Sequence, residues 1–190
     1  MLIEILPYTT RWPEEFQQIG AKLRATLGNA ALRIDHIGST SVPNLAAKDI
    51  IDVQITVAAL DPAVAAVLGE NGYQQLAHIT GDHRPPTDNS PAAQWSKWFF
   101  KPAPDHRPVN IHMRIADHAN QRYALLFRDY LRTHPLAAAA YAQVKMALAQ
   151  RDNADIDFYY AVKDPVCDII MAGAQEWVVR DSWQLGPSDA

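Results

Sequence analysis

The hydrophobic pattern of this chain changes its period near Asp117, and that change restricts the folds the chain can adopt. Before Asp117, runs rich in β-branched and aromatic residues alternate with amphipathic helical stretches, whereas after it apolar residues recur only at helical spacing. We therefore expect one α/β (α+β) domain over residues 1–190. A mixed sheet with flanking helices should occupy about 1–116, and a C-terminal helical section about 117–190.

Local signals divide the chain into expected elements. Residue composition predicts strands over 31–37, 50–57, 73–79, 95–101 and 109–115. Capping residues, prolines and glycines predict helices over about 10–27, 61–70, 118–133, 136–150 and from about 155 onward, with short helical potential within 38–48. Asp155 is the expected N-cap of the last helix, and Pro165 should kink or restart it.

A polar, proline-rich stretch over residues 80–94 separates two of the expected strands. Loops of this length in compact domains are lids, binding loops or disordered segments, and the sequence leaves these alternatives open. The aromatic residues that follow it are expected in the core: Trp95, Trp98, Phe99 and Phe100.

Composition excludes several classes of site. Cys167 is the only cysteine, so an internal disulfide, a cysteine-based zinc site and an iron–sulfur cluster are excluded, and a reducing compartment is favoured. It lies in an apolar helical stripe, where we expect it to be buried and inert. The N-terminal residues resemble no signal peptide and no stretch is apolar enough to span a membrane, so we expect a cytoplasmic protein with no membrane partner.

The net charge of −4 hides an uneven distribution. Residues 84–151 hold ten Lys or Arg against four Asp or Glu, which is +6, while the remainder holds seven against seventeen, which is −10. The distribution is typical either of an uneven solvated surface or of a basic wall that faces an anionic ligand. It suits a small phosphate-bearing molecule and gives little support to a long nucleic acid.

Small and hydroxylated residues follow the first expected strand. The segment Gly38-Ser39-Thr40-Ser41 lets the backbone approach a ligand closely, and its N–H and hydroxyl groups can cradle a phosphate. Lys48 can supply a positive charge to that phosphate. These residues are our candidate phosphate-binding group.

Two expected strands carry polar residues on one face by alternation. Asp52 and Gln54 share a face of strand 50–57, and Asn110, His112 and Arg114 share a face of strand 109–115. Burying a carboxylate such as Asp52 among Ile and Val is costly unless it binds a cation or hydrogen-bond donors. His112 is either a structural histidine or a metal ligand or acid–base group.

Other candidates have a structural and a functional interpretation. His36 either forms part of a site wall or bonds to a loop carbonyl. Arg128 and Arg132 share a helix face that suits a phosphate, although Asp129 could pair with Arg132 on the surface. The spacing of Tyr141 and Lys145 fits a pocket, or packing with a solvated amine.

The Gly-Ser turn followed by an acid in the next strand resembles the nucleotidyltransferase superfamily. A closer resemblance, to the GrpB family, covers nearly the whole chain. It rests on Pro7-Tyr8, Trp12-Pro13, Phe16, the segment from His36 to Pro43, Leu45 to Lys48, Ile50 to Asp52, Asn110 to His112, Phe127 to Arg132, His134-Pro135, Tyr141, Lys145, Tyr160 and Lys163. Asn44 and Asp49 depart from the family pattern, where glycine and proline are common.

The resemblance implies a nucleotidyltransferase fold and a set of roles. In that superfamily strand carboxylates hold divalent metals that bind the triphosphate and activate the attacking hydroxyl. Asp52 would then hold Mg²⁺ or Mn²⁺ with help from Gln54 or His112, with His112 in the place of a later carboxylate. Gln54 departs from the pattern, because an uncharged amide is a poorer ligand for magnesium.

Three functions remain open from the sequence. The first is metal-dependent nucleotidyl transfer to a small acceptor, with Asp52 and His112 catalytic and Lys48, Arg114 and Arg128 neutralising charge. The second is a non-catalytic module that binds a nucleotide or coenzyme A and has lost the full carboxylate set. The third is hydrolysis that uses His112. The acceptor and the oligomeric state are left open.

Overall fold

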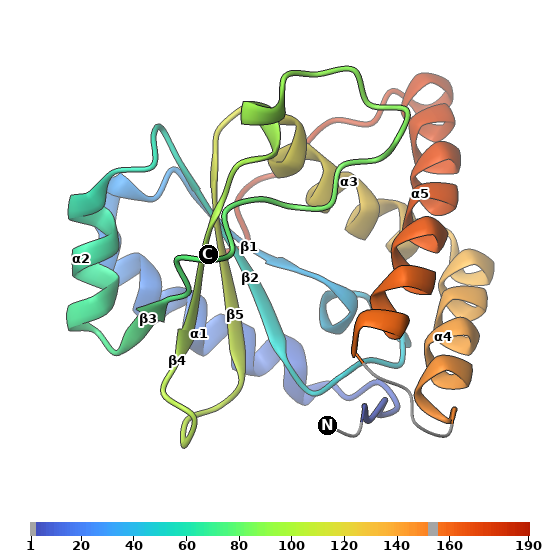
Figure 1. Ribbon diagram of the computed structural model, residues 1–190, viewed down its shortest axis with the longest axis horizontal. Helices are drawn as coiled ribbons and strands as arrows, with labels where there is room; N and C mark the ends of the chain where they lie inside the picture. The colour runs from blue at the N-terminus through green and yellow to red at the C-terminus, as the bar shows by residue number, and fades with distance from the viewer. Residues whose placement is uncertain (1–2, 152–155) are drawn as a thin grey trace.

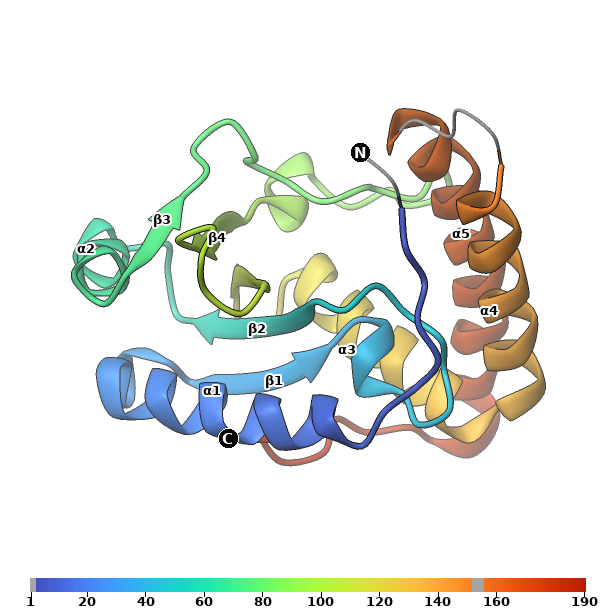
Figure 2. The same cartoon turned by 90° about the horizontal axis from the view of Figure 1, so that it is seen from below.

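The computed structural model describes residues 3–151 and 156–190 and holds a five-stranded mixed sheet (Figures 1 and 2). The strands are β1 (Arg33–Ile37), β2 (Ile51–Val57), β3 (Tyr73–Gln75), β4 (Trp98–Pro102) and β5 (Val109–Ile115), in the order β1-β2-β5-β4-β3. β2 and β5 pair in parallel, while the other neighbours are antiparallel. The central pair therefore brings Asp52 opposite Asn110, and Gln54 opposite His112.

Five helices accompany this sheet within the described residues. They are α1 (Arg11–Leu27), α2 (Pro62–Glu70), α3 (Ala119–Thr133), α4 (Pro135–Ala149) and α5 (Ile156–Asp181). α1 lies along β1, while α4 and α5 lie side by side beyond one end of the sheet (Figure 2). The expected mixed sheet, flanking helices and C-terminal helical section are confirmed. No described helix has the length and apolar character needed to cross a bilayer.

Packing between α1 and the sheet forms the main core. Trp12, Phe16 and Leu23 on α1 are fully buried against strand residues such as Ile34 and Ile55. A second cluster joins the segment after β1 to the helices, through Val42, Leu45, Leu131, Tyr141 and Cys167. This second cluster fixes the Gly-Ser turn against α3, α4 and α5, and so positions the site.

The structure corrects several element boundaries. β3 ends at Gln75 rather than near residue 79, and β4 begins at Trp98 rather than at 95. Residues Ala92–Trp95 instead form a 3₁₀ turn, because the Trp95 indole N–H donates to Asp88 and Ser90 within the preceding loop.

The helical section follows the expected breaks with one exception. α3 ends at Thr133 as predicted, and α4 begins at Pro135, one residue before its expected start. α5 continues through Pro165 without restarting. The expected cap at Asp155 lies outside the described residues. The short helical potential after β1 is confirmed as a 3₁₀ turn over Ser39–Ser41.

Candidate functional site

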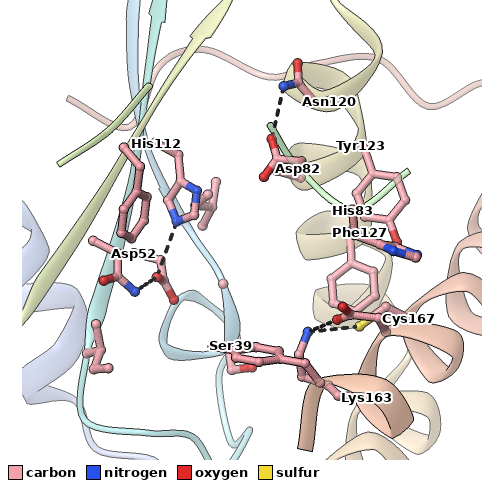
Figure 3. Close-up of a pocket in the computed structure, with 18 of the residues that line it drawn as sticks. Ser39, Asp52, Asp82, His83, His112, Asn120, Tyr123, Phe127, Lys163 and Cys167 are labelled. Carbon is pink, nitrogen blue, oxygen red and sulfur yellow. Dashed lines mark hydrogen bonds and ion pairs between the residues drawn. The ribbon is translucent and has the colours of Figure 1, made fainter. Parts of the chain in front are cut away.

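A cavity of about 600 Å³ lies between the sheet, the Gly-Ser turn, the loop before β4 and helices α3, α4 and α5. Asp52 and His112 extend into it from the strands, and Lys163 and Cys167 face it from α5 (Figure 3). Ser39 lies at its edge between these two walls (Figure 3). Both the sheet and the helical section therefore supply the lining.

Gly38 allows the turn to lie directly against Asp52. Its φ is 68°, in the left-handed region that L side chains rarely adopt. A Cβ atom at this position would overlap the Asp52 carboxylate. The requirement for glycine thus comes from both backbone conformation and close approach.

The carboxylate of Asp52 is held by two neighbours on β5. Asn110 Nδ2 donates to Oδ1 at 2.8 Å, and His112 Nε2 lies 3.6 Å from the same oxygen (Figure 3). Burial raises the pKa of Asp52, but His112 and Asn110 outweigh it and leave that pKa below its usual value. Asp52 is therefore ionised at neutral pH.

His112 is neutral and donates toward Asp52. Its Nδ1 lies 3.3 Å from both Lys97 Nζ and Arg114 Nη2, which only donate, so Nδ1 accepts and Nε2 carries the proton. Burial is the main cause that lowers the pKa of His112, and the positive charges of Arg114 and Lys97 add to it, which brings this pKa to about 4. In this tautomer Nε2 has no lone pair for a metal.

Gln54 does not reach the cavity, contrary to its expected role as a metal ligand. Its side chain is fully buried: Oε1 accepts from Arg114 Nη1, and Nε2 donates to the Gln121 carbonyl at 3.2 Å. Arg114 lines the cavity, but Asp82 occupies its guanidinium from two sides, at 2.8 and 2.9 Å. Both side chains are committed to a buried network rather than to a ligand.

The remaining donor set does not fit the expected Mg²⁺ or Mn²⁺ site. Asp52 is the only one of the three proposed ligands that presents a free lone pair to the cavity. Within residues 3–151 and 156–190, no group of three or more His, Cys, Asp or Glu is arranged to hold a metal ion. Divalent magnesium is normally held by carboxylates together with substrate phosphates.

Arg128 and Arg132, expected to bind phosphate, are not among the residues that line the cavity. Arg128 Nη1 donates to the carbonyl of His36 at 3.0 Å and to the Asp189 carboxylate at 2.7 Å. Arg132 Nε donates to the Ser41 carbonyl at 3.0 Å. Both arginines therefore hold backbone carbonyls on either side of the turn.

His36 is also structural. It stacks on Phe16 with ring centroids 4.6 Å apart, and its Nε2 contacts Thr40 Oγ1 at 3.0 Å. Burial lowers the pKa of His36 to about 3. Thr40 lines the cavity, whereas the hydroxyl of Ser41 is turned toward the Gly38 carbonyl at 2.6 Å.

Lys48, which precedes β2, and a lysine and two tyrosines of α5 complete the site. Lys48 Nζ lies 4.2 Å from the centroid of Tyr159 and 5.2 Å from that of Tyr160. Burial lowers the pKa of Lys48. Lys163 Nζ contacts Asp164 Oδ1 at 2.7 Å and lines the same wall.

Sequence reasoning missed Lys97, Lys101 and Tyr159, which also line the cavity. Three of the expected core aromatics are buried, in two different places. Phe100 is in the main core, whereas Trp95 and Phe99 lie at the cavity wall. Asp82, in the proline-rich loop, was the sequence signal that could have pointed to Lys97, because a carboxylate in such a loop can bind a buried cation.

Lys145 lies at the junction of the two walls. It is 3% exposed, and its Nζ contacts Ser39 Oγ at 2.8 Å and the Ala46 carbonyl at 2.6 Å. The ring of Tyr141 lies 4.6 Å from Nζ, and the Tyr141 hydroxyl contacts Cys167 Sγ at 3.5 Å. Burial lowers the pKa of Lys145 to about 7.

The loop over 80–94 contacts both walls. Asp82 accepts from Lys97 Nζ at 2.6 Å and from Asn120 Nδ2 at 3.0 Å (Figure 3). His83 Nε2 contacts Asp168 on α5 at 3.0 Å. The loop therefore bridges from the sheet to α5 beside the cavity (Figure 1).

Known proteins resemble this chain in sequence and in fold. A family model described as GrpB protein matches residues 2–172. The crystal structure of conserved protein GrpB from Enterococcus faecalis is 28% identical, with a TM-score of 0.74, and the match covers 91% of this chain and 98% of that one. A UPF0157 protein of Halalkalibacterium halodurans is 33% identical, over 90% of this chain and 82% of that protein.

A longer relative carries an enzyme name. A protein of Mycolicibacterium paratuberculosis named dephospho-CoA kinase is 38% identical over 96% of this chain and 48% of its own length. The chain thus spans about half the length of the first curated relatives that it matches.

Proposed function

This chain belongs to the GrpB family, and from that membership and the geometry of the cavity we propose that it binds a nucleotide or another phosphate-bearing small molecule. The single observation that carries the proposal is the placement of ammonium groups around the Gly-Ser turn. Lys48 and Lys163 line one cavity with Ser39, and Lys48, unlike Lys163, has no carboxylate partner among the described residues, so an anionic ligand would offset its charge.

The aromatic lining supports a ligand with a planar part as well as a phosphate. Phe99, Phe127, Tyr141 and Tyr160 face the same cavity, and its volume of about 600 Å³ lies in the usual range for small-molecule sites. A phosphate at the lysines would leave a base free to stack on these rings. We propose that binding needs no divalent metal, since the donor set supplies only Asp52.

Metal-dependent nucleotidyl transfer is the second candidate. The observation that favours it is the ionised carboxylate of Asp52, which lies directly behind Gly38 and faces the cavity. A nucleotide-bound cation could complete its shell with phosphate oxygens, so the experiment includes a metal arm. Coenzyme A species join the panel because of the longer relatives named dephospho-CoA kinase.

Thermal unfolding with a ligand panel tests the proposal. ATP, ADP, dephospho-coenzyme A, coenzyme A and inorganic phosphate are each added with EDTA or with MgCl₂. A ligand at about 100 times its Kd stabilises by about 2.7 kcal/mol, which raises the Tm of a chain of this size by roughly 5–10 °C. We expect a nucleotide to reach this shift equally in EDTA and in MgCl₂.

Lys48→Ala should reduce the shift, whereas Lys22→Ala, at an exposed position of α1, should leave it unchanged. A shift that requires Mg²⁺ and is lost in Asp52→Asn would favour metal-dependent transfer instead. Absence of a shift with every compound would contradict the binding proposal itself.

A further inference from the structure

Lys145 is a buried amine with no carboxylate partner among the described residues. Its polar contacts in the structure are a serine hydroxyl and a backbone carbonyl, and no carboxylate among residues 3–151 and 156–190 forms an ion pair with it. A lysine buried without a counter-ion favours its neutral form, in which nitrogen has a lone pair.

The two contacts fit a neutral amine that accepts a proton. The Ala46 carbonyl can only accept, so one N–H of Lys145 is directed to it at 2.6 Å. In the structure Nζ donates to Ser39 Oγ at 2.8 Å, and loss of one proton from the ammonium would leave a lone pair beside that hydroxyl. Ser39 is half-buried and lines the cavity, so its oxygen is accessible to a bound molecule.

The charged and titratable groups around Nζ act in both directions. Lys48 and Lys163 disfavour protonation, while Asp52 and the thiol of Cys167 favour it. Together with burial they bring the pKa of Lys145 to about 7, close to the operating pH that suits a general base.

We propose that Ser39 is a nucleophile activated by Lys145, and that the cavity transfers an acyl group from an ester or thioester of a phosphate-bearing molecule. Ser39 Oγ attacks the carbonyl carbon while its proton passes to Lys145 Nζ, and the resulting ammonium returns that proton to the departing alkoxide or thiolate. The acyl-serine then passes its acyl group to water, and Lys145 takes a proton from that water and returns it to Oγ. Serine–lysine pairs are a recurrent variant of the catalytic triad.

Acyl transfer fits this donor set better than phosphoryl transfer. Phosphoryl transfer depends on metal ions that bridge the phosphate oxygens, and no three or more His, Cys, Asp or Glu among the described residues are arranged to hold one. Acyl transfer needs a positioned nucleophile, a base and hydrogen-bond donors for the developing oxyanion, and none of these is a metal ion. The phosphate-bearing part of this substrate rests on the proposed function above, whereas the Ser39–Lys145 pair does not.

Labelling with a fluorophosphonate tests the pair directly. The probe forms a P–O bond to a nucleophilic serine and releases fluoride, and peptide mass spectrometry locates the adduct. We expect a single adduct at Ser39, formed at least 100-fold faster than on the urea-unfolded chain, at a rate that rises with pH through about 7. Ser39→Ala should abolish it.

Lys145→Arg is the decisive variant, because arginine stays protonated and so provides no base. We expect labelling to fall roughly 100-fold, and Lys145→Met to behave alike, with folding checked for each by thermal melting. Ser90→Ala, in the loop outside the cavity lining, is the control and should label as the wild type does. A short p-nitrophenyl ester should also give a burst of one nitrophenolate per chain.

Labelling of Ser39 no faster than in the unfolded chain, or unchanged in a folded Lys145→Arg variant, would overturn the proposal. The nucleotide thermal shift of the wild type separates the two ideas. A shift without labelling would leave only ligand binding, and labelling without a shift would leave the nucleophile but remove the phosphate-bearing substrate.

Discussion

At the scale of single residues, the hydrogen-bond partners of each candidate side chain decide whether it faces the cavity. Asp52, Ser39 and Lys48 keep surfaces that face the cavity, whereas Gln54 is enclosed by the Arg114 guanidinium and the Gln121 carbonyl. Strand alternation placed Asp52 and Gln54 on the same face, which is correct. Alternation does not show what covers each residue on that face, and α3 covers one of them.

His112 gives a pH dependence that can be measured. Its pKa is about 4 in the folded chain and about 6.5 when unfolded, so the unfolded state binds a proton more readily. Stability from the neutral ring is therefore complete above about pH 6.5 and is lost as the pH falls toward 4. His36, with a pKa of about 3, acts in the same direction.

We expect His112→Gln to flatten the fall in the free energy of unfolding between pH 6.5 and 4, as measured by urea titration at several pH values. In the wild type Asp52 does not obscure this window, because its lowered pKa affects stability only below about 4. A slope equal to that of the wild type would show that His112 takes up a proton as readily in the folded chain as in the unfolded chain.

At the scale of elements, the loop over 80–94 is held beside the cavity by contacts with the sheet and with α5. Asp82 holds it to the sheet through Arg114 and Lys97, and His83 holds it to α5 through Asp168. Its composition indicated only a long loop. Buried charge at Asp82 fixes one end, whereas the His83 contact is partly exposed and weaker.

We therefore expect His83→Ala to release this loop without unfolding the protein. Amide hydrogen exchange should accelerate within residues 83–91, while the free energy of unfolding changes by less than about 1 kcal/mol. Asp168→Asn should have the same effect, and His106→Ala, which removes an exposed pair with Asp105, should have none. Unchanged exchange in both His83 and Asp168 variants would show that the loop is held elsewhere.

At the scale of the whole molecule, segments distant in the sequence support the turn. The C-terminal residues lie along β1: Ala190 N donates to the Ile34 carbonyl, and the Asp189 carboxylate accepts from both His36 N and Arg128. The +6 segment is likewise divided, because Lys97, Lys101 and Lys145 reach the cavity while Arg128 and Arg132 do not.

Asp189→Asn should destabilise the protein, because Arg128 is 4% exposed and would lose a carboxylate at 2.7 Å. Asp129 still pairs with Arg128, so we expect a loss of about 1–3 kcal/mol in the free energy of unfolding rather than complete unfolding. Asp181→Asn, whose pair with Arg180 is exposed, is the matched control and should change stability by less than about 1 kcal/mol. Equal stability of the two variants would contradict this account.

The sequence alone determined the strands, most helix ends and the glycine at position 38, because these depend on local backbone preferences and on short-range periodicity. It also identified Ser39, Lys48, Asp52 and His112 as residues of one site, through the Gly-Ser turn and the polar strand faces. Only the tertiary structure decided that Arg128 supports the turn from behind.

The pairing of Lys145 with Ser39 likewise required the tertiary structure, because it joins α4 to a turn more than a hundred residues earlier. Such a contact depends on how the helical section packs against the sheet, and no local pattern reports that packing. The same packing buries Lys145 without a counter-ion among the described residues, and burial is the physical reason for its lowered pKa.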